Sequence, residues 1–347
     1  MIPLEEILLS MEARSCHNRS RSLADTVIPM LSGSDKMAIF ADKQSKMESL
    51  SILIPAFNWD CSRLVYDLYS QGQALDISYE IILADDCSTD TELSERNRKA
   101  VERLENCRFI GLSHNMGRAA IRNMLASEAR YDKLLFLDCD SSVRDESFLC
   151  NYLNAADRAL VVCGGAIHPD TLPEPGEELR WRYERNADKE RSAEFRSRMP
   201  YSRFTPFSFL IDRKTFLDIR FDESYRGYGY EDVQFGRELE ERGVSILHID
   251  NPLVHLGLEK NDIFLNKTRQ AVLNAYLHRD EIGGSSRLLN HYKRMGQCHM
   301  LWLLRMLWRL FGKSMERNLL SNKPSLWVFS LYKLCYLCSL KQNTCSR

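Results

Sequence analysis

Five short apolar runs in the first half of the chain constrain its fold more than any other feature. They are LSILI at 50–54, YEIILA at 79–84, RFIGL at 108–112, KLLFL at 133–137 and ALVVC at 159–163. Each run is nearly continuous in apolar residues, which is typical of strands buried on both faces. The stretches between them are long enough for crossover helices, so the sequence predicts a parallel sheet in an α/β sandwich, with ligands at the carboxyl ends of the strands.

The composition is that of a globular protein. Of the 347 residues, 44% are hydrophobic and 27% are charged, which suffices for one large core plus an appendage or for two modest domains. The net charge of −1 gives no general attraction for polyanions, so we expect no nucleic-acid partner. The cysteine count, 11, is odd, and several cysteines lie in apolar runs, which favours a reducing cytosol over a disulfide framework.

The two ends of the chain differ from its middle. Residues 1–47 mix charges with short apolar runs and are interpreted as a variable lead-in without a signal peptide, and we expect no transmembrane helix. Residues 286–347 form a predicted amphipathic helical extension, whose segments 299–311 and 326–340 resemble helices that lie in a membrane interface. Packing onto the catalytic domain or a partner subunit stays open as the alternative, so an oligomer is also open.

Polar residues follow four successive strands, at the ends where ligands gather in parallel sheets. They are Pro55, Ala56 and Asn58 after the first strand, Asp85 and Asp86 after the second, Asn115, Gly117, Arg118 and Arg122 after the third, and Asp138 and Asp140 after the fourth. Two arginines four residues apart near a helix N-terminus suit phosphate oxygens. Two aspartates at alternate positions of an extended segment can converge on a hard divalent cation.

The series IPAFN, ADDCSTD, HNMGRAAIRN and LDCD, in this order, resembles the nucleotide-sugar half of family 2 glycosyltransferases. Further on, the GYGYED within 209–243 is similar to the GWGGED of bacterial chondroitin-type polymerases and β-1,4-galactosyltransferases. The resemblance covers about residues 48–285 and implies the GT-A fold, a Rossmann-like α/β/α sandwich with a mostly parallel central sheet. It also implies a nucleotide-sugar half at 48–165 and an acceptor half at 166–285.

The resemblance implies a role for each matching residue. Pro55, Ala56 and Asn58 would line the nucleotide pocket, Asp85 would accept a hydrogen bond from uracil, Asp86 would support the loop, and Asn115, Gly117, Arg118 and Arg122 would surround ribose and diphosphate. Asp138 would meet ribose or sugar hydroxyls, and Asp140 would bind Mn²⁺ or Mg²⁺. His255 occupies the place of a histidine metal ligand in related enzymes; a core role for it, and His248 as a substitute, stay open. Tyr228, Tyr230 and His168 are candidates for donor choice.

The chemistry needs a base as well as a metal. The acceptor hydroxyl must lose a proton as it attacks, and a carboxylate on the acceptor side should take it. Glu231 and Asp232 follow a glycine-aromatic loop and open a predicted helix. In the family the aspartate of this pair is the base, which gives Asp232, with Glu231 as the second candidate.

These residues predict an inverting, metal-dependent glycosyltransferase. It would move a sugar from a nucleotide-diphosphate donor, preferably uridine-linked, to a saccharide or lipid-linked saccharide in surface polysaccharide synthesis. We expect it in the cytoplasm, peripheral at the inner face of the cell membrane. The alternatives are a sugar-phosphate nucleotidyltransferase and a catalytically inactive saccharide-binding subunit.

Overall fold

The computed structural model describes residues 49–169 and 171–340, so the predicted lead-in at 1–47 lies outside the described residues. In this part of the chain the larger sheet has the strand order β3 (Cys107–Gly111), β2 (Ser78–Asp85), β1 (Ser49–Ala56), β4 (Lys133–Leu137), β8 (Ser208–Asp212), β6 (Val161–Cys163) and β9 (Ile246–His248). The five predicted runs are β1, β2, β3, β4 and β6, which all point the same way. The prediction of a mostly parallel sheet is therefore confirmed.

Strand β8 was not predicted, and it runs antiparallel to both of its neighbours, β4 and β6. Its first residue therefore lies beside the last residue of β4, with Ser208 paired to Leu137. Just beyond this pair, the backbone N–H of Asp138 donates to the carbonyl of Phe207 at 3.0 Å. The loop before β8 thus fixes the start of the two-aspartate turn.

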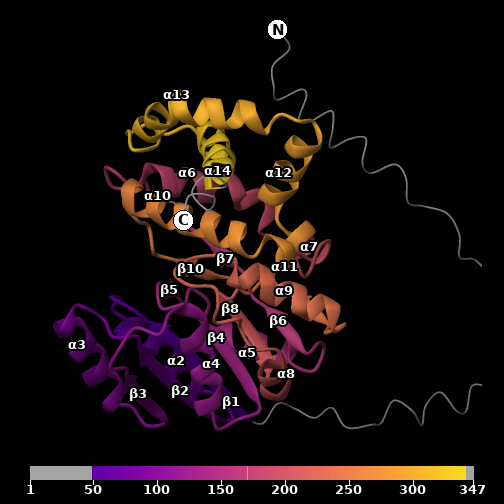
Figure 1. The fold of residues 1–347 in the computed structure, drawn as a ribbon. Coiled ribbons are helices and arrows are strands. Elements are labelled where there is room, and N and C mark those ends of the chain that lie inside the picture. The colour runs from indigo at the N-terminus through magenta and orange to yellow at the C-terminus, as the bar shows by residue number, and fades with distance from the viewer. Residues whose placement is uncertain (1–48, 170, 341–347) are drawn as a thin grey trace, which may run out of the picture. The chain divides into compact units, whose positions relative to one another are not determined.

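Helices cover both faces of this sheet, as the alternation of buried side chains along the strands requires. One face packs on α2 (Ser62–Gln73) and α5 (Phe148–Ala155), through Leu50, Ile52 and Leu135 among others. The opposite face packs on α4 (Arg118–Glu128), α8 (Arg213–Ile219) and α9 (Glu231–Glu241), through Leu53 and Phe136. Helix α3 (Thr91–Glu102) lies beside β3. Figure 1 shows the resulting layers.

A second, small sheet brings distant segments together. Its strand order is β5 (Ser141–Ser142), β10 (Leu253–His255) and β7 (Ala166–Ile167). Because β5 directly follows the two-aspartate turn and pairs Ser141 with His255, the histidine is held beside that turn. The backbone N–H of Leu256 also donates to the carbonyl of Asp140 at 2.8 Å.

The dense charge of residues 179–198 predicts a mobile, solvated helix or loop, but the structure shows a helical segment with several buried side chains. The segment contains α6 (Glu178–Ala187), a 3₁₀ turn (Asp188–Glu190) and α7 (Ala193–Ser197). Leu179 is fully buried, and Glu184 and Arg196 are only 5% and 6% exposed. Burial of these charges is tolerated because each is paired: Arg196, for example, donates to the carbonyls of Cys163, Gly164 and Ile249.

The C-terminal part is helical: α10 (Asn261–Leu277), α11 (Arg279–Ile282), a 3₁₀ turn (Gly283–Ser285), α12 (Arg287–Gln297), α13 (Leu301–Leu319) and α14 (Leu326–Leu340). Figure 1 shows these helices grouped beyond β10 and β7. Helix α14 contacts α6, α10, α12 and α13, and buries Phe329, Tyr332 and Cys335. For α14 the structure therefore follows the alternative of packing onto the catalytic domain. Among the described residues, no helix is both long and apolar enough to cross a membrane.

Candidate active site

The loop after β1 is fastened to the loop after β2. The side-chain oxygen of Asn58 accepts from the backbone N–H of Thr89 at 2.8 Å, and the backbone N–H of Asn58 donates to the hydroxyl of Ser88 at 2.8 Å. Asp85, 4% exposed, accepts from Ser88 through Oδ1 and from the hydroxyl of Ser94 through Oδ2. Both predicted nucleotide-binding loops are thus rigid, and Oδ2 of Asp85 keeps one further acceptor position.

Asp86 holds the loop that follows β3. Its two oxygens accept from the backbone N–H groups of Met116, at 2.6 Å, and Gly117, at 3.0 Å, and its carbonyl accepts from the side chain of Asn115 at 2.9 Å. Gly117 has a φ of 87°, in the region that favours glycine, and a Cβ there would meet no heavy atom within 4 Å. The loop therefore leaves open space just before the N-terminus of α4.

Four charged residues meet at the start of α4. Arg118 Nε donates to Glu231 Oε1 at 2.8 Å, and Arg118 Nη2 lies 3.5 Å from Asp138 Oδ2. Arg122, which is 2% exposed, donates to Asp138 Oδ1 and to the carbonyl of Arg118. The structure thus brings together the arginines and the aspartate that the sequence predicted to surround ribose and phosphate, and adds Glu231 to them.

Asp140 and His255, the two predicted metal ligands, are neighbours. His255 Nε2 lies 3.2 Å from Asp140 Oδ2. Burial would lower the pKa of His255, but its hydrogen bond with Asp140 and the nearby carboxylate of Glu184 raise it to about 9. A Cβ on Gly257 would lie 2.3 Å from Asp140 Oδ2 and 3.0 Å from His255 Nε2. Only a residue without a side chain leaves the space between these ligand atoms free.

The sequence analysis did not identify Glu184 and Arg180, which lie behind His255. The second ring nitrogen of His255, Nδ1, lies 3.4 Å from Glu184 Oε1, and His168 Nδ1 lies 2.8 Å from Glu184 Oε2. Arg180, one turn earlier on α6, donates to the same carboxylate. Burial would raise the pKa of Glu184, but its contacts with both histidines and the charge of Arg180 lower it well below its usual range. No sequence motif marks Glu184, because it lies among many other charges.

The glycine-aromatic loop before α9 is held from α10. Gly227 and Gly229 have φ values of 76° and 93°, and Tyr230, which precedes α9, has a φ of 74°. The side-chain amide of Asn274 donates to the carbonyls of Arg226 and Gly229, both at 3.0 Å, and to that of Tyr228 at 3.4 Å. This one side chain therefore keeps the turn that presents Glu231 and Asp232 in a single shape.

Glu231 and Asp232 have opposite electrostatic environments. Burial would raise the pKa of Glu231, but the charges of Arg118 and Arg122 lower it. Burial and the charge of Glu231 together raise the pKa of Asp232 to about 6. A carboxylate with this pKa accepts a proton readily near neutral pH, whereas the paired Glu231 does so far less readily.

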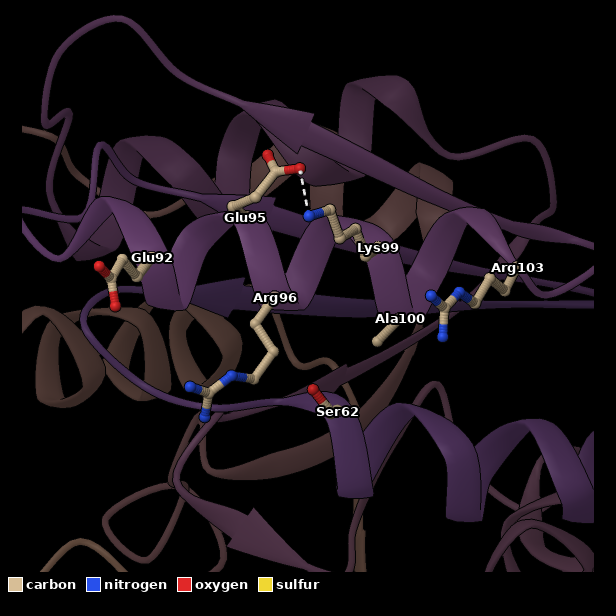
Figure 2. Close-up of a pocket in the computed structure, with 7 residues that line it drawn as sticks. All are labelled: Ser62, Glu92, Glu95, Arg96, Lys99, Ala100 and Arg103. Atoms are coloured by element: carbon tan, nitrogen blue, oxygen red, sulfur yellow. Dashed lines mark ion pairs between the residues drawn. The ribbon is translucent and has the colours of Figure 1, made fainter.

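Two other features lie apart from this group. His248 has partners elsewhere: its Nδ1 lies 2.8 Å from Arg196 Nη1, and its Nε2 lies 3.0 Å from the carbonyl of Pro200. An open hollow of about 540 Å³ lies beside α3. Figure 2 shows the residues that line it: Ser62, Glu92, Glu95, Arg96, Lys99, Ala100 and Arg103. None of the predicted site residues lines it.

The sequence comparison identifies the catalytic domain. Residues 51–220 match the sequence profile described as Glycosyl transferase family 2. The chain thus contains a glycosyltransferase domain similar to that family. A curated relative, an uncharacterized glycosyltransferase of Haemophilus influenzae, is 24% identical over 245 residues, which cover 68% of this chain and 91% of that protein. The similarity to family 2 favours glycosyl transfer over the nucleotidyltransferase and the inactive saccharide-binding subunit.

Comparison with solved structures gives the fold. The mannosyltransferase PcManGT from Pyrobaculum calidifontis, solved in complex with GDP-Man and Mn²⁺, matches with a TM-score of 0.51 and 13% identity, over 98% of this chain and 95% of that chain. The GT-A fold expected for this glycosyltransferase is therefore confirmed. S. aureus TarS matches with a TM-score of 0.41 and 16% identity, over 66% of this chain and 40% of the TarS chain.

Proposed function

We propose that this glycosyltransferase is a metal-dependent, inverting enzyme that uses a nucleotide-diphosphate sugar. The main support for metal dependence is that Asp140 and His255 lie side by side, next to the space that Gly257 leaves open. Two ligands at right angles on an octahedral Mn²⁺ or Mg²⁺, each about 2.1 Å from the ion, lie about 3 Å apart. The 3.2 Å between Oδ2 and Nε2 fits this requirement, and the carboxylate is a ligand type that suits Mn²⁺ and Mg²⁺. The bound ion would neutralise charge on the departing diphosphate.

Protein groups would supply the rest of the donor site. Arg118 would reach the diphosphate from the N-terminus of α4, while the buried Arg122 holds Asp138 in place for ribose or sugar hydroxyls. The remaining acceptor position of Asp85 supports a uridine-linked donor, because the N–H of uracil could donate to it. Asp86 would act indirectly, by keeping the 115–117 loop open for the phosphates.

Asp232 would act as the general base. Its raised pKa and its place at the start of α9, after the loop held by Asn274, suit a group that takes a proton from an acceptor hydroxyl. Glu231 would instead keep Arg118 in position. One base acting in a single displacement implies inversion at the anomeric carbon.

We also propose that the enzyme works at the inner face of the cell membrane on a saccharide or lipid-linked saccharide acceptor, in surface polysaccharide synthesis. The support is the outer side of α13, where Trp302, Met306 and Leu310 are exposed, as is Leu320 directly after the helix. Helical spacing places the exposed bases Arg309, Lys313 and Arg317 on the same side. Glu316 is the only acid between residues 286 and 340, and it pairs with Arg269 at 2.7 Å. Apolar and basic groups together fit an anionic lipid surface.

A donor screen tests the function. We expect a UDP-sugar, in the presence of Mn²⁺, to raise the melting temperature of the full-length protein more than GDP-, ADP- or dTDP-sugars do. The donor that raises the melting temperature most should then release free nucleoside diphosphate when the enzyme is also given an acceptor. Asp140→Ala should lose the Mn²⁺-dependent part of the shift. Equal shifts with chelator and with Mn²⁺ would contradict the metal assignment, and a larger shift with a GDP-sugar would contradict uridine.

A further inference from the structure

His255 has a carboxylate at each of its two ring nitrogens. Nε2 faces Asp140 at 3.2 Å, on the side where Gly257 leaves space, and Nδ1 faces Glu184 Oε1 at 3.4 Å. Because one imidazole nitrogen can ligate a metal only if it carries no proton, the proton of a neutral ring must then be on the other. Nδ1 is buried and has no hydrogen-bond partner with good geometry, and Glu184 is the carboxylate that lies nearest to accept its proton.

Glu184 is itself fixed from several sides. It is 5% exposed and lies on α6, outside every motif of the donor site. Arg180 donates to its Oε1, and His168 Nδ1 lies 2.8 Å from its Oε2. The rings of His168 and His255 pack edge to face, with centroids 5.5 Å apart. A buried carboxylate held in this way has little freedom to move away from His255.

We propose that Glu184 is a positioning residue that holds the proton of His255 on Nδ1 and so directs the Nε2 lone pair toward a divalent cation at Asp140. This inference rests on the metal site proposed above. Carboxylates that hydrogen-bond to a ligating histidine fix the orientation of its ring and increase its basicity. Glu184 thus has a reason to be charged and buried that a purely structural link between α6 and β10 would not require.

A second cation in this group is disfavoured. His168, Glu184 and His255 each offer one ligand atom, and these atoms lie within 4.8 Å of one another. However, the guanidinium of Arg180 already contacts the carboxylate, and its positive charge would oppose an ion there. A cation bound through His255 Nδ1 would also displace the proton that Glu184 is placed to accept.

Mn²⁺ binding to the full-length protein, without donor or acceptor, tests the inference. Free Mn²⁺ is measured by electron paramagnetic resonance for the wild type, Glu184→Gln, His255→Ala and the double variant. We expect Glu184→Gln to weaken Mn²⁺ binding about 10- to 100-fold, the usual effect of losing such a partner. In the His255→Ala background the same change should have no further effect, because Glu184 acts through the histidine. Glu178→Gln removes a carboxylate from the same helix and should leave Mn²⁺ affinity unchanged.

The outcomes separate this inference from the metal site itself. If His255→Ala binds Mn²⁺ as the wild type does, the proposed metal site is wrong. If His255→Ala is weakened but Glu184→Gln is not, or if Glu184→Gln weakens binding equally in both backgrounds, only the role of Glu184 is wrong. Melting temperatures in chelator show whether each variant is folded. If Glu184→Gln does not fold, Glu184→Asp replaces it, because the shorter carboxylate keeps the charge beside Arg180 but draws back from Nδ1.

Discussion

Arg118 Nε and Glu231 Oε1 lie 2.8 Å apart and join α4 to α9 across 113 residues of sequence. The same arginine lies 3.5 Å from Asp138, so it connects the two-aspartate turn to α9. Glu231 is 4% exposed and depends on this partner to balance its charge. The pair therefore separates the roles of two adjacent carboxylates, because Glu231 is paired with an arginine whereas Asp232 accepts only from the backbone N–H of Val233, at 2.8 Å.

Asp232→Asn should slow transfer without weakening donor binding. The amide keeps the shape of the side chain but cannot accept a proton, so the turnover rate at saturating donor and acceptor should fall about 10²- to 10⁴-fold. Donor affinity, measured by calorimetry with Mn²⁺, should stay within about twofold. A loss that appears only in donor affinity would place Asp232 in the nucleotide site instead. A product that retains the donor's anomeric configuration would also contradict the assignment.

The rate of transfer should depend on pH through Asp232. Its pKa is raised to about 6, and only the ionised form can accept the hydroxyl proton. Activity should therefore be lost as the pH falls through about 6 and should be level above about 7. In Asp232→Asn the residual rate should no longer decrease as the pH falls through about 6, and we call this decrease the acid limb. Glu231→Gln is the matched variant: it should keep an acid limb, because Asp232 is still present, but the limb should shift to lower pH because the charge of Glu231 helps to raise the pKa of Asp232.

Arg118 and Glu231 should be coupled in stability. Arg118→Ala leaves a buried carboxylate without its partner and should lower the free energy of unfolding by about 1–2 kcal/mol, a modest value because the arginine side chain is 38% exposed. Glu231→Gln in that background should recover part of the loss. Urea unfolding of the four proteins in a double-mutant cycle measures the coupling. Strictly additive effects would show that the ion pair contributes nothing.

Gly257→Ala should impair metal binding while the fold survives. The new methyl group would lie 2.3 Å from Asp140 Oδ2, so the carboxylate must move out of the space where the ion is proposed to bind. We expect Mn²⁺ affinity to fall at least about tenfold, as calorimetry would show. Gly284→Ala is a suitable control, since a methyl group there would meet no heavy atom within 4 Å. If Gly257→Ala binds Mn²⁺ with unchanged affinity, the ion does not bind between Asp140 and His255.

Vesicle binding should depend on the outer side of α13. Replacing Trp302, Met306 and Leu310 by serine removes exposed apolar groups and should weaken cosedimentation with phosphatidylglycerol-containing vesicles at least about tenfold. Tyr66→Ser on α2 removes an equally exposed ring, 56% accessible, and should have no effect. Deleting the whole extension would be less informative, because α14 is part of the packed interior. If the wild-type protein does not cosediment with the vesicles, a protein partner for α13 is favoured over a membrane.

The sequence predicted what local patterns encode and missed what distant residues supply. The parallel strands were predictable because each is a continuous apolar run. Strand β8 is also apolar, but its reversed direction depends on its place between β4 and β6. Residues 179–198 were misread because charge density indicates exposure only when charges are unpaired, and Glu184 has partners in Arg180 and His168. Likewise, no local pattern links Asn274 to the loop 45 or more residues before it.

Asn274 has a consequence for how an acceptor sugar is recruited. A loop with two glycines, Gly227 and Gly229, would lose considerable conformational entropy on binding if it were free in solution. The three carbonyls bound by Asn274 remove that freedom when the chain folds. The loss of conformational entropy on ordering the loop then occurs once, during folding, and is not repeated at every turnover. Under the proposed function, acceptors can therefore associate and leave many times in succession without the loop having to be reassembled around each one.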